Sequence, residues 1–465
     1  MRFAMLVIGL ELNTWQLAAS YHEKSFYPKQ FEERKSLDKE FKKLEFSSLL
    51  TEDFWAIEKT PFIEANEKHG FFWVSNKNKE TARAFKMPVT FRSTKVEEAL
   101  VRFSNLHPQE ITLYLYNRGD AGEISKEKFL DLIERTSQEL NTWLQSNGKN
   151  QPEIKRTAGS RLNRKLWETS LMVTQLEWSH TIGRGSDNFR YRPEFARVTM
   201  TPPQLQTTAS KSLFAEKDEE ITLEILRARV ERKENGDVAI TKLPMVDQGP
   251  KGYCVVASAE RVFRYFGKKV DQHELAQMAR SGANQGTSIE AMMEVLKRLQ
   301  SKFDVNLRSH YEFEFDDFLR FVKDYNRLAK RKKIPEVELG IMVDMLEVYR
   351  VMQLDLLTEA KIKRQKADYN RFSTKISKYT ENGIPILWSV IVGKVQENPE
   401  LRGMGGHMRL IIGYNKKTSE IIYTDSWGSG HEYKRMSLDD AWAITKNLST
   451  IEIKNLTSQI RALDS

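Results

Sequence analysis

Four residues in the second half of the chain, Cys254, His407, Asp425 and Gln248, have the types and order needed for nucleophilic catalysis. Cys254 is the only cysteine among 465 residues and directly precedes a strongly apolar helical pattern. A cysteine attacks as the thiolate, and its pKa falls at a helix N-terminus and beside a histidine that can become an imidazolium. A lone cysteine is otherwise a common core residue. The catalytic interpretation therefore depends on a suitable histidine elsewhere in the chain.

Among the eight histidines, His407 is the best placed to act as the base. It follows Met404-Gly405-Gly406 and opens the strand-like run MRLIIGY, and the glycines leave room for a substrate backbone. A catalytic histidine also needs a third group that fixes its tautomer and ring orientation. Asp425, in the run EIIYTDSW, can supply it, because an antiparallel hairpin of the two runs would bring both residues to the same open end.

An acyl-transfer site also requires hydrogen-bond donors aimed at the developing oxyanion. Gln248 lies six residues before Cys254, so its side-chain amide can join the backbone N–H of Cys254 as a second donor. Gly249 and Gly252 permit the turn between them. Trp427 follows Asp425 closely and is expected to shield the histidine–aspartate bond from water. The residues expected to contact a substrate are Gly252, Tyr253, Gly406 and Trp427.

The segments QGPKGYCVVAS, GGHMRLIIGY and TDSWGSG, in this order, resemble motifs of the papain-like cysteine peptidases, most closely the C39-like branch related to bacteriocin-processing peptidases. In that superfamily a glutamine six residues before the cysteine lines the oxyanion hole, and the histidine pairs with an Asn or Asp that often stands in an NSWG motif. Here the motif is DSWG. The resemblance implies an oxyanion role for Gln248, a nucleophile at Cys254, a base at His407 and an orienting role for Asp425.

The resemblance covers about residues 243–450, and the segment GTS at residues 286–288 also resembles a C39-like feature. Two departures stand out. A charged, mainly helical region at about residues 301–378 is interpreted as an insertion, and no transmembrane exporter domain follows. The resemblance therefore does not imply leader-peptide cleavage coupled to export.

Three functions fit this set of residues. A cysteine peptidase is favoured by the DSWG motif and the upstream glutamine; an acyltransferase would use the same triad with an amine as acceptor; a catalytically silent module would only bind peptides. His273 and Glu274 lack a second histidine at helical spacing, and no Walker loop, dinucleotide fingerprint or cysteine-rich metal spacing occurs. The expected partner is therefore a peptide or protein substrate, with no metal and no cofactor.

The elements around these motifs predict an α+β fold in two parts. The linker-like segment TPPQLQTTASKS, residues 201–212, separates an α+β N-terminal domain, about residues 21–205, from a papain-like domain at about 213–465. In the second domain, a central catalytic helix begins near Cys254, and the runs IPILWSVIV, HMRLIIGY and EIIYTDSW predict an antiparallel sheet. The runs ITLEILRARVERK and VAITKLP predict a hairpin, with Asn235 and Gly236 at positive φ in its turn.

In the N-terminal domain, HGFFWVSN and ITLYLYNRG have the composition of strands, and residues 126–145 have apolar residues at helical spacing. These patterns indicate architecture but no chemistry. Recruiting a substrate, shielding the cleft and mediating assembly all remain open roles for this domain.

Composition indicates a globular protein of about two to four domains, since 40% of the residues are hydrophobic and 29% are charged. The net charge of +9 is spread along the chain, and its densest cluster, KRKK at residues 330–333, is expected to be a solvated helix end. No nucleic-acid partner is therefore expected. A single cysteine excludes an internal disulfide, and the sequence does not indicate an oligomeric state.

The first 20 residues weakly resemble a secretory signal, with Arg2 followed by FAMLVIGL and LAAS. The apolar run is short and Glu11 interrupts the pattern, so a cytoplasmic location is favoured over export. No segment of the sequence has the length and apolar character of a membrane span.

Overall fold

The computed structural model describes residues 41–155, 160–183, 190–203, 221–249, 252–268, 270–278, 303–340, 343–398 and 403–461, together with Glu294, Lys297, Gln300 and Leu401. The signal-like segment at residues 1–20, the GTS segment at 286–288, most of the helix expected at 289–300 and most of the linker at 201–212 lie outside these described residues.

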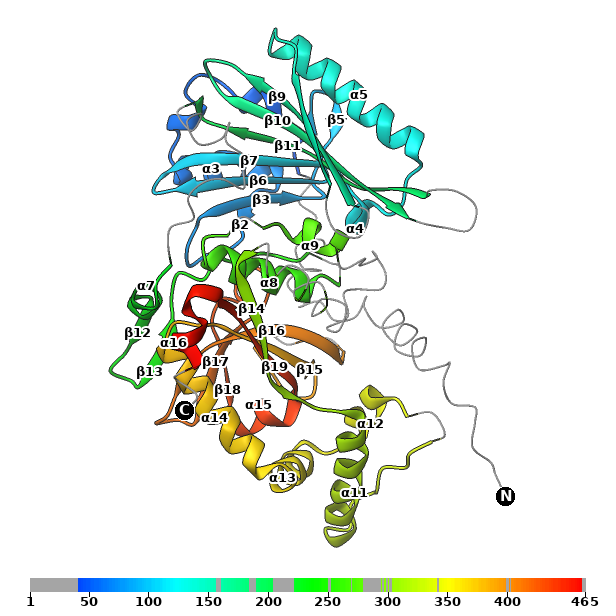
Figure 1. The fold of residues 1–465 in the computed structure, drawn as a ribbon, viewed down its shortest axis with the longest axis vertical. Coiled ribbons are helices and arrows are strands. Elements are labelled where there is room, and N and C mark those ends of the chain that lie inside the picture. Colours follow the sequence, from blue (N-terminus) through cyan, green and yellow to red (C-terminus); the bar gives the residue numbers. More distant parts are fainter. Residues whose placement is uncertain are drawn as a thin grey trace. The chain divides into compact units, whose positions relative to one another are not determined.

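The described residues form two compact units (Figure 1). The N-terminal unit contains residues 41–203 and, from later in the sequence, residues 270–278; the C-terminal unit contains residues 221–268 and the described residues from 294 onward. The N-terminal unit is rich in β-strands, and the C-terminal unit combines helices with an antiparallel sheet. The predicted α+β fold class is thus confirmed, while the domain boundary at residues 201–212 stays a prediction.

The N-terminal unit is built on an eight-stranded antiparallel sheet in the order β2-β3-β6-β7-β11-β10-β9-β8. Its helix α5 (Lys126–Trp143) confirms the predicted helix, and the apolar stripe of Phe129, Ile133 and Leu140 joins the core of the sheet. A three-stranded sheet, β1-β4-β5, lies at Leu44–Glu45, Val89–Phe91 and Thr94–Lys95. The strands of the large sheet are β2 (Phe72–Trp73), β3 (Thr81–Phe85), β6 (Glu98–Ser104), β7 (His107–Asn117), β8 (Lys149–Lys155), β9 (Ser160–Glu168), β10 (Val173–Gly183) and β11 (Arg190–Thr201).

One short helix of the N-terminal unit, α9 (Gln272–Met278), comes from the sequence that follows Cys254. Arg197 of β11 donates to Glu274 at 2.9 Å, and Tyr114 of β7 donates to Asp271 at 2.6 Å. Buried charged and polar groups are stable only when they find such partners. These bonds therefore fix α9 to the large sheet.

The sheet of the C-terminal unit has the order β12-β13-β16-β15-β19-β14, and β17 and β18 branch from β16. The three predicted strands are confirmed as β15, β16 and β17. β16 pairs with β13, β15 and β17, and every one of its residues except Gly406 is buried. The strands are β12 (Val230–Arg232), β13 (Asp237–Ile240), β14 (Val305–Glu312), β15 (Ile386–Val392), β16 (Gly405–Asn415), β17 (Glu420–Thr424), β18 (Lys434–Ser437) and β19 (Thr445–Ile453).

The helices of the C-terminal unit follow the predicted pattern with one correction. Helix α8 (Cys254–Tyr265) confirms the helix expected after the cysteine motif, and Gly267 follows it at φ +76°. The region expected to be a helical insertion from about residue 301 instead begins with β14, which pairs with β19 at the edge of the sheet. The helices that follow are α11 (Phe315–Arg331), α12 (Met345–Val351), α13 (Leu354–Arg364), α14 (Lys366–Glu381), α15 (Leu438–Ile444) and α16 (Thr457–Arg461).

The hairpin predicted before the cysteine motif is only partly correct. β12 and β13 pair as expected, but the first arm begins with a helix, α7 (Leu223–Ala228). The side chain of Thr222 accepts the N–H of Ile225 and caps that helix, which overrides the strand-like composition. In the turn, only Gly236 has a positive φ, because Asn235 instead uses its side-chain oxygen to accept the N–H of Asp237.

Two surface predictions can be compared with the structure. The basic residues 330–333 are exposed at the end of α11, as expected for a solvated helix end. Within the part of the chain that the structure describes, no helix combines the length and the apolar character needed to cross a membrane.

Candidate active site

Helix α8, which begins at Cys254, packs against β16, the strand that carries His407. Cys254 is the first residue of α8 and is half-buried, at the helix end where the macrodipole favours a thiolate. One turn later, Ser258 donates its hydroxyl to the carbonyl oxygen of Met408 at 3.4 Å. Residues i and i+4 share a helix face. The face of α8 that carries Cys254 therefore packs on the beginning of β16.

His407 and Asp425 are brought together by the pairing of β16 with β17, as the hairpin predicted from the sequence requires. Nε2 of His407 lies 3.2 Å from Oδ1 of Asp425. The His407 ring stacks on Trp427, with 4.0 Å between the ring centroids and 11° between the planes. Burial lowers the pKa of His407, and the adjacent Asp425 offsets this effect only in part.

The carboxylate of Asp425 is fully buried beside Arg409, Lys434 and His431. Arg409 Nε donates to its Oδ1 at 2.7 Å, while Lys434 Nζ and His431 Nδ1 lie 3.3 and 3.4 Å from its Oδ2. Burial alone would raise the pKa of Asp425, but Arg409 and Lys434 hold it well below its ordinary value. Asp425 is therefore ionised at neutral pH.

Arg261 links the helix of Cys254 to the strand end that carries Asp425. It donates to the backbone oxygens of Asp425 and Pro244 at 2.8 and 2.9 Å and to the hydroxyl of Thr424 at 2.8 Å. Burial lowers the pKa of Arg261 to about 10, so it remains charged at neutral pH. Its guanidinium group thus ties α8 and β17 into one rigid arrangement.

Gln248 is oriented by two hydrogen bonds to Ser426, the residue after Asp425. The Gln248 N–H donates to the Ser426 carbonyl at 2.9 Å, and the Ser426 hydroxyl donates to Gln248 Oε1 at 2.6 Å. Because the amide oxygen accepts from Ser426, the Nε2 donors of Gln248 point the other way. Gly249 follows at φ +66°, a conformation that favours glycine.

The four positions expected to contact substrate differ in exposure. Gly252 is half-buried, and Tyr253 is buried directly before α8. Gly406 is exposed, and no atom lies within 4 Å of where a Cβ would stand, which leaves open space beside His407. Trp427 is half-buried, and one face of its ring lies on the imidazole of His407.

Removing Ser426's hydroxyl is expected to weaken catalysis through Gln248. For the cysteine peptidase expected from the sequence, Gln248→Ala should lower kcat by about a hundredfold or more, as for the loss of one oxyanion donor. Ser426→Ala should lower kcat by about tenfold, because Gln248 Oε1 then loses the hydrogen bond that it accepts from the Ser426 hydroxyl. Steady-state kinetics measures both. The matched control is Ser389→Ala: this buried hydroxyl of β15 has no hydrogen-bond partner among the described residues, so kcat should not change. Equal kcat for Ser426→Ala and Ser389→Ala would contradict the orienting role.

Sequence reasoning missed Arg409, Lys434, His431 and Ser426. One signal was present for Arg409, since His407 and Arg409 are two residues apart in a strand and therefore share a face. A charged residue at that position of an apolar strand requires a buried partner. Lys434 and His431 come from sequence beyond the recognised motif and carried no comparable signal.

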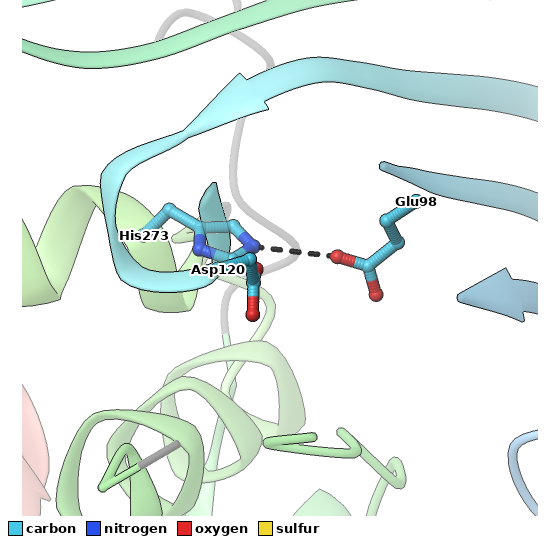
Figure 2. A group of neighbouring side chains, drawn as sticks. All are labelled: Glu98, Asp120 and His273. Carbon is cyan, nitrogen blue, oxygen red and sulfur yellow. Dashed lines mark ion pairs between the residues drawn. The ribbon is translucent and has the colours of Figure 1, made fainter. Parts of the chain in front are cut away.

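A separate group in the N-terminal unit, formed by Glu98, Asp120 and His273, has the residue types of a metal site (Figure 2). Its three potential ligand atoms lie within 4.8 Å of one another. Arg83 already donates to Glu98 at 2.6 Å, and the Asn117 amide donates to Asp120 at 2.9 Å and contacts Nδ1 of His273. These contacts make the group a network of ion pairs and hydrogen bonds that holds α9. No sequence pattern indicates this group, because its members come from β6, α4 (Arg118–Ala121) and α9.

Comparison with known proteins supports the resemblance seen in the motifs. Residues 338–450 match the model of the Peptidase C39 like family, a segment that contains His407 and Asp425 and begins after Cys254 and Gln248. Among solved structures, the chain is similar to xylellain, a cysteine protease from Xylella fastidiosa, with 14% identity over 51% of this chain and 91% of that chain. The TM-score is 0.25, which carries no weight for function. A search of curated proteins found no match. The resemblance to C39-like peptidases is thus confirmed.

Proposed function

We propose that this chain is a cysteine peptidase that hydrolyses peptide bonds, because residues 338–450 match the Peptidase C39 like family. Cys254 is the nucleophile, His407 the general base and acid, and Asp425 the group that orients His407. Gln248 supplies a donor to the oxyanion.

One observation carries the proposal: α8, which begins at Cys254, packs on β16, the strand of His407. The hydrogen bond from Ser258 to Met408 supports this packing, and the hydrogen bond from Arg261 to the Asp425 carbonyl links α8 to the third residue. A buried His–Asp pair and a cysteine at the N-terminus of a helix packed on the same strand can serve as base, orienting group and nucleophile.

The reaction would proceed by acylation and deacylation. His407 accepts the thiol proton of Cys254, and the thiolate attacks the carbonyl carbon of the peptide bond. The negative oxygen of the tetrahedral intermediate accepts hydrogen bonds from the Cys254 N–H and from Gln248. His407 then donates its proton to the leaving amine, which leaves a thioester. Water, deprotonated by His407, hydrolyses the thioester and regenerates the thiol.

The experiment that tests this function presents a labelled peptide with and without an added primary amine. A peptidase yields free carboxylate and amine products whether or not the amine is added. An acyltransferase, the second candidate, joins the acyl fragment to the added amine. Binding of the peptide without any product would indicate the silent module and would exclude both catalytic functions.

A further inference from the structure

Three charged residues around Asp425, namely Arg409, Glu397 and Lys434, are not assigned by the proposed function, on which this inference rests. We propose that they are positioning residues, here called the Asp425 clamp, that fix the Asp425 carboxylate and balance its charge, so that Asp425 orients His407 as a neutral hydrogen-bond acceptor would.

The contacts of Asp425 Oδ1 support the claim that the clamp fixes the position of the carboxylate. Arg409 Nε donates to this oxygen at 2.7 Å with hydrogen-bond geometry. Nε2 of His407 lies farther from the same oxygen, at 3.2 Å. Arg409 therefore makes the stronger bond on the oxygen that faces His407, and the position of the carboxylate follows the position of Arg409.

Glu397 in turn holds Arg409. Both carboxylate oxygens of Glu397 accept from Arg409 Nη2, at 2.9 and 2.8 Å, and Glu397 Oε2 also lies 2.8 Å from Lys434 Nζ and accepts the Tyr423 hydroxyl at 2.6 Å. The side chains of Arg409 and Glu397 are 0% and 2% exposed. Ion pairs at this depth are rigid, because a partner that moves away leaves an unpaired buried charge.

The charges of Asp425 and the clamp residues support the claim that the clamp balances the charge of Asp425. Asp425 and Glu397 contribute two negative charges, and Arg409 and Lys434 contribute two positive charges, so the four groups are balanced without His407. A proton on His407 would thus meet no uncompensated carboxylate. The carboxylate of Asp425, in the DSWG motif, would then affect the charge of His407 no more than the neutral amide of an Asn in an NSWG motif would.

Other titratable or charged groups of the described residues also lie around the His407–Asp425 pair. Arg261 of α8 binds the Asp425 backbone, with Glu432 as a charged neighbour of Arg261. His431 faces Oδ2 of Asp425, and the Tyr423 hydroxyl faces the clamp through Glu397. Among the described residues, the titratable or charged groups around this pair and the clamp include Arg261, Glu397, His407, Arg409, Tyr423, Asp425, His431, Glu432 and Lys434.

The test compares Glu397→Gln, Arg409→Met and the double variant in the full chain. The titration of the His407 ring is followed by NMR of histidine-labelled protein, with His407→Gln assigning its signal among the eight histidines. Glu397→Gln removes a negative charge and should lower the titration midpoint by about half a pH unit or more, and Arg409→Met should raise it by a similar amount. The double variant should titrate near the wild type.

Activity supplies the second measurement. The double variant should lower kcat by about tenfold or more with little change in KM, because charge balance is kept while the orientation of Asp425 is lost. Arg435→Met is the matched control: Arg435 lies in β18, is 32% exposed, and pairs with Asp237 and Glu420. This variant should change neither the midpoint nor kcat.

Unchanged midpoints, or midpoints that move in the same direction in both single variants, would overturn the clamp. If Arg409→Met does not fold, the titration midpoints of His407 in Glu397→Gln and in the double variant still test the clamp. The NMR titration needs no substrate. Absence of peptide cleavage by the wild type would therefore refute the proposed function while the titration still tests the clamp.

Discussion

Replacing Cys254 with alanine is expected to lower kcat for peptide cleavage by about three to six orders of magnitude, since the nucleophile is removed. The same change should abolish labelling by a thiol reagent, because the chain has no other cysteine. Cleavage of a fluorogenic peptide and mass spectrometry after treatment with iodoacetamide measure the two effects.

The fold should tolerate Cys254→Ala. The residue is half-buried at the first position of α8, and alanine is smaller and favours helix, so the free energy of unfolding should change by about 1 kcal/mol or less. Circular dichroism and urea unfolding provide this control. Peptide cleavage that persists in a folded Cys254→Ala protein would refute the cysteine-peptidase mechanism.

The second large effect is expected at Asp425, in stability as well as activity. Asp425→Ala leaves the buried Arg409 and Lys434 without this carboxylate and should lower the free energy of unfolding by about 3–5 kcal/mol. Asp425→Asn should be milder in both stability and kcat, because its amide oxygen still accepts from Arg409 and from the His407 ring. Urea unfolding at pH 7 and steady-state kinetics measure the difference.

Measuring the free energy of unfolding over a series of pH values tests whether Asp425 is ionised in the folded protein. A carboxyl whose folded-state pKa lies below its unfolded value contributes stability above the unfolded pKa of about 4 and loses it as the pH falls toward the folded value. The stability difference between wild type and Asp425→Asn should therefore narrow below about pH 4. As a control, Asp425→Asn combined with Lys434→Met removes one charge of each sign and should recover part of the stability at pH 7. Equal losses of kcat in the Asn and Ala variants would contradict the orienting role.

Local sequence patterns predicted the elements of the C-terminal unit well. Helix α8 and the strands β15, β16 and β17 combine long apolar periodicity with clear turn signals, and their pairing is local. The approach of His407 to Asp425 followed from one hairpin. The resemblance to C39-like peptidases could also be recognised from the sequence, because the motifs that carry it are short and contiguous.

Long-range partners were not predictable in the same way. Glu397 reaches Arg409 from the segment after β15, and Lys434 comes from β18, so no periodic pattern joins them. The strand-like composition of residues 221–226 was misleading because the cap at Thr222 decides the local structure. No sequence pattern around His273 and Glu274 indicated which unit these residues would join.

The membership of α9 in the N-terminal unit has a consequence for synthesis on the ribosome. Domains generally begin to fold as they emerge, N-terminal parts first. When residues 41–203 have emerged, Arg197 and Tyr114 still lack Glu274 and Asp271, which are translated after Cys254 and all of α8. The N-terminal unit therefore completes its buried charge pairs only after the nascent chain already contains the proposed nucleophile, and a ribosome that stops before residue 271 releases both units unfinished.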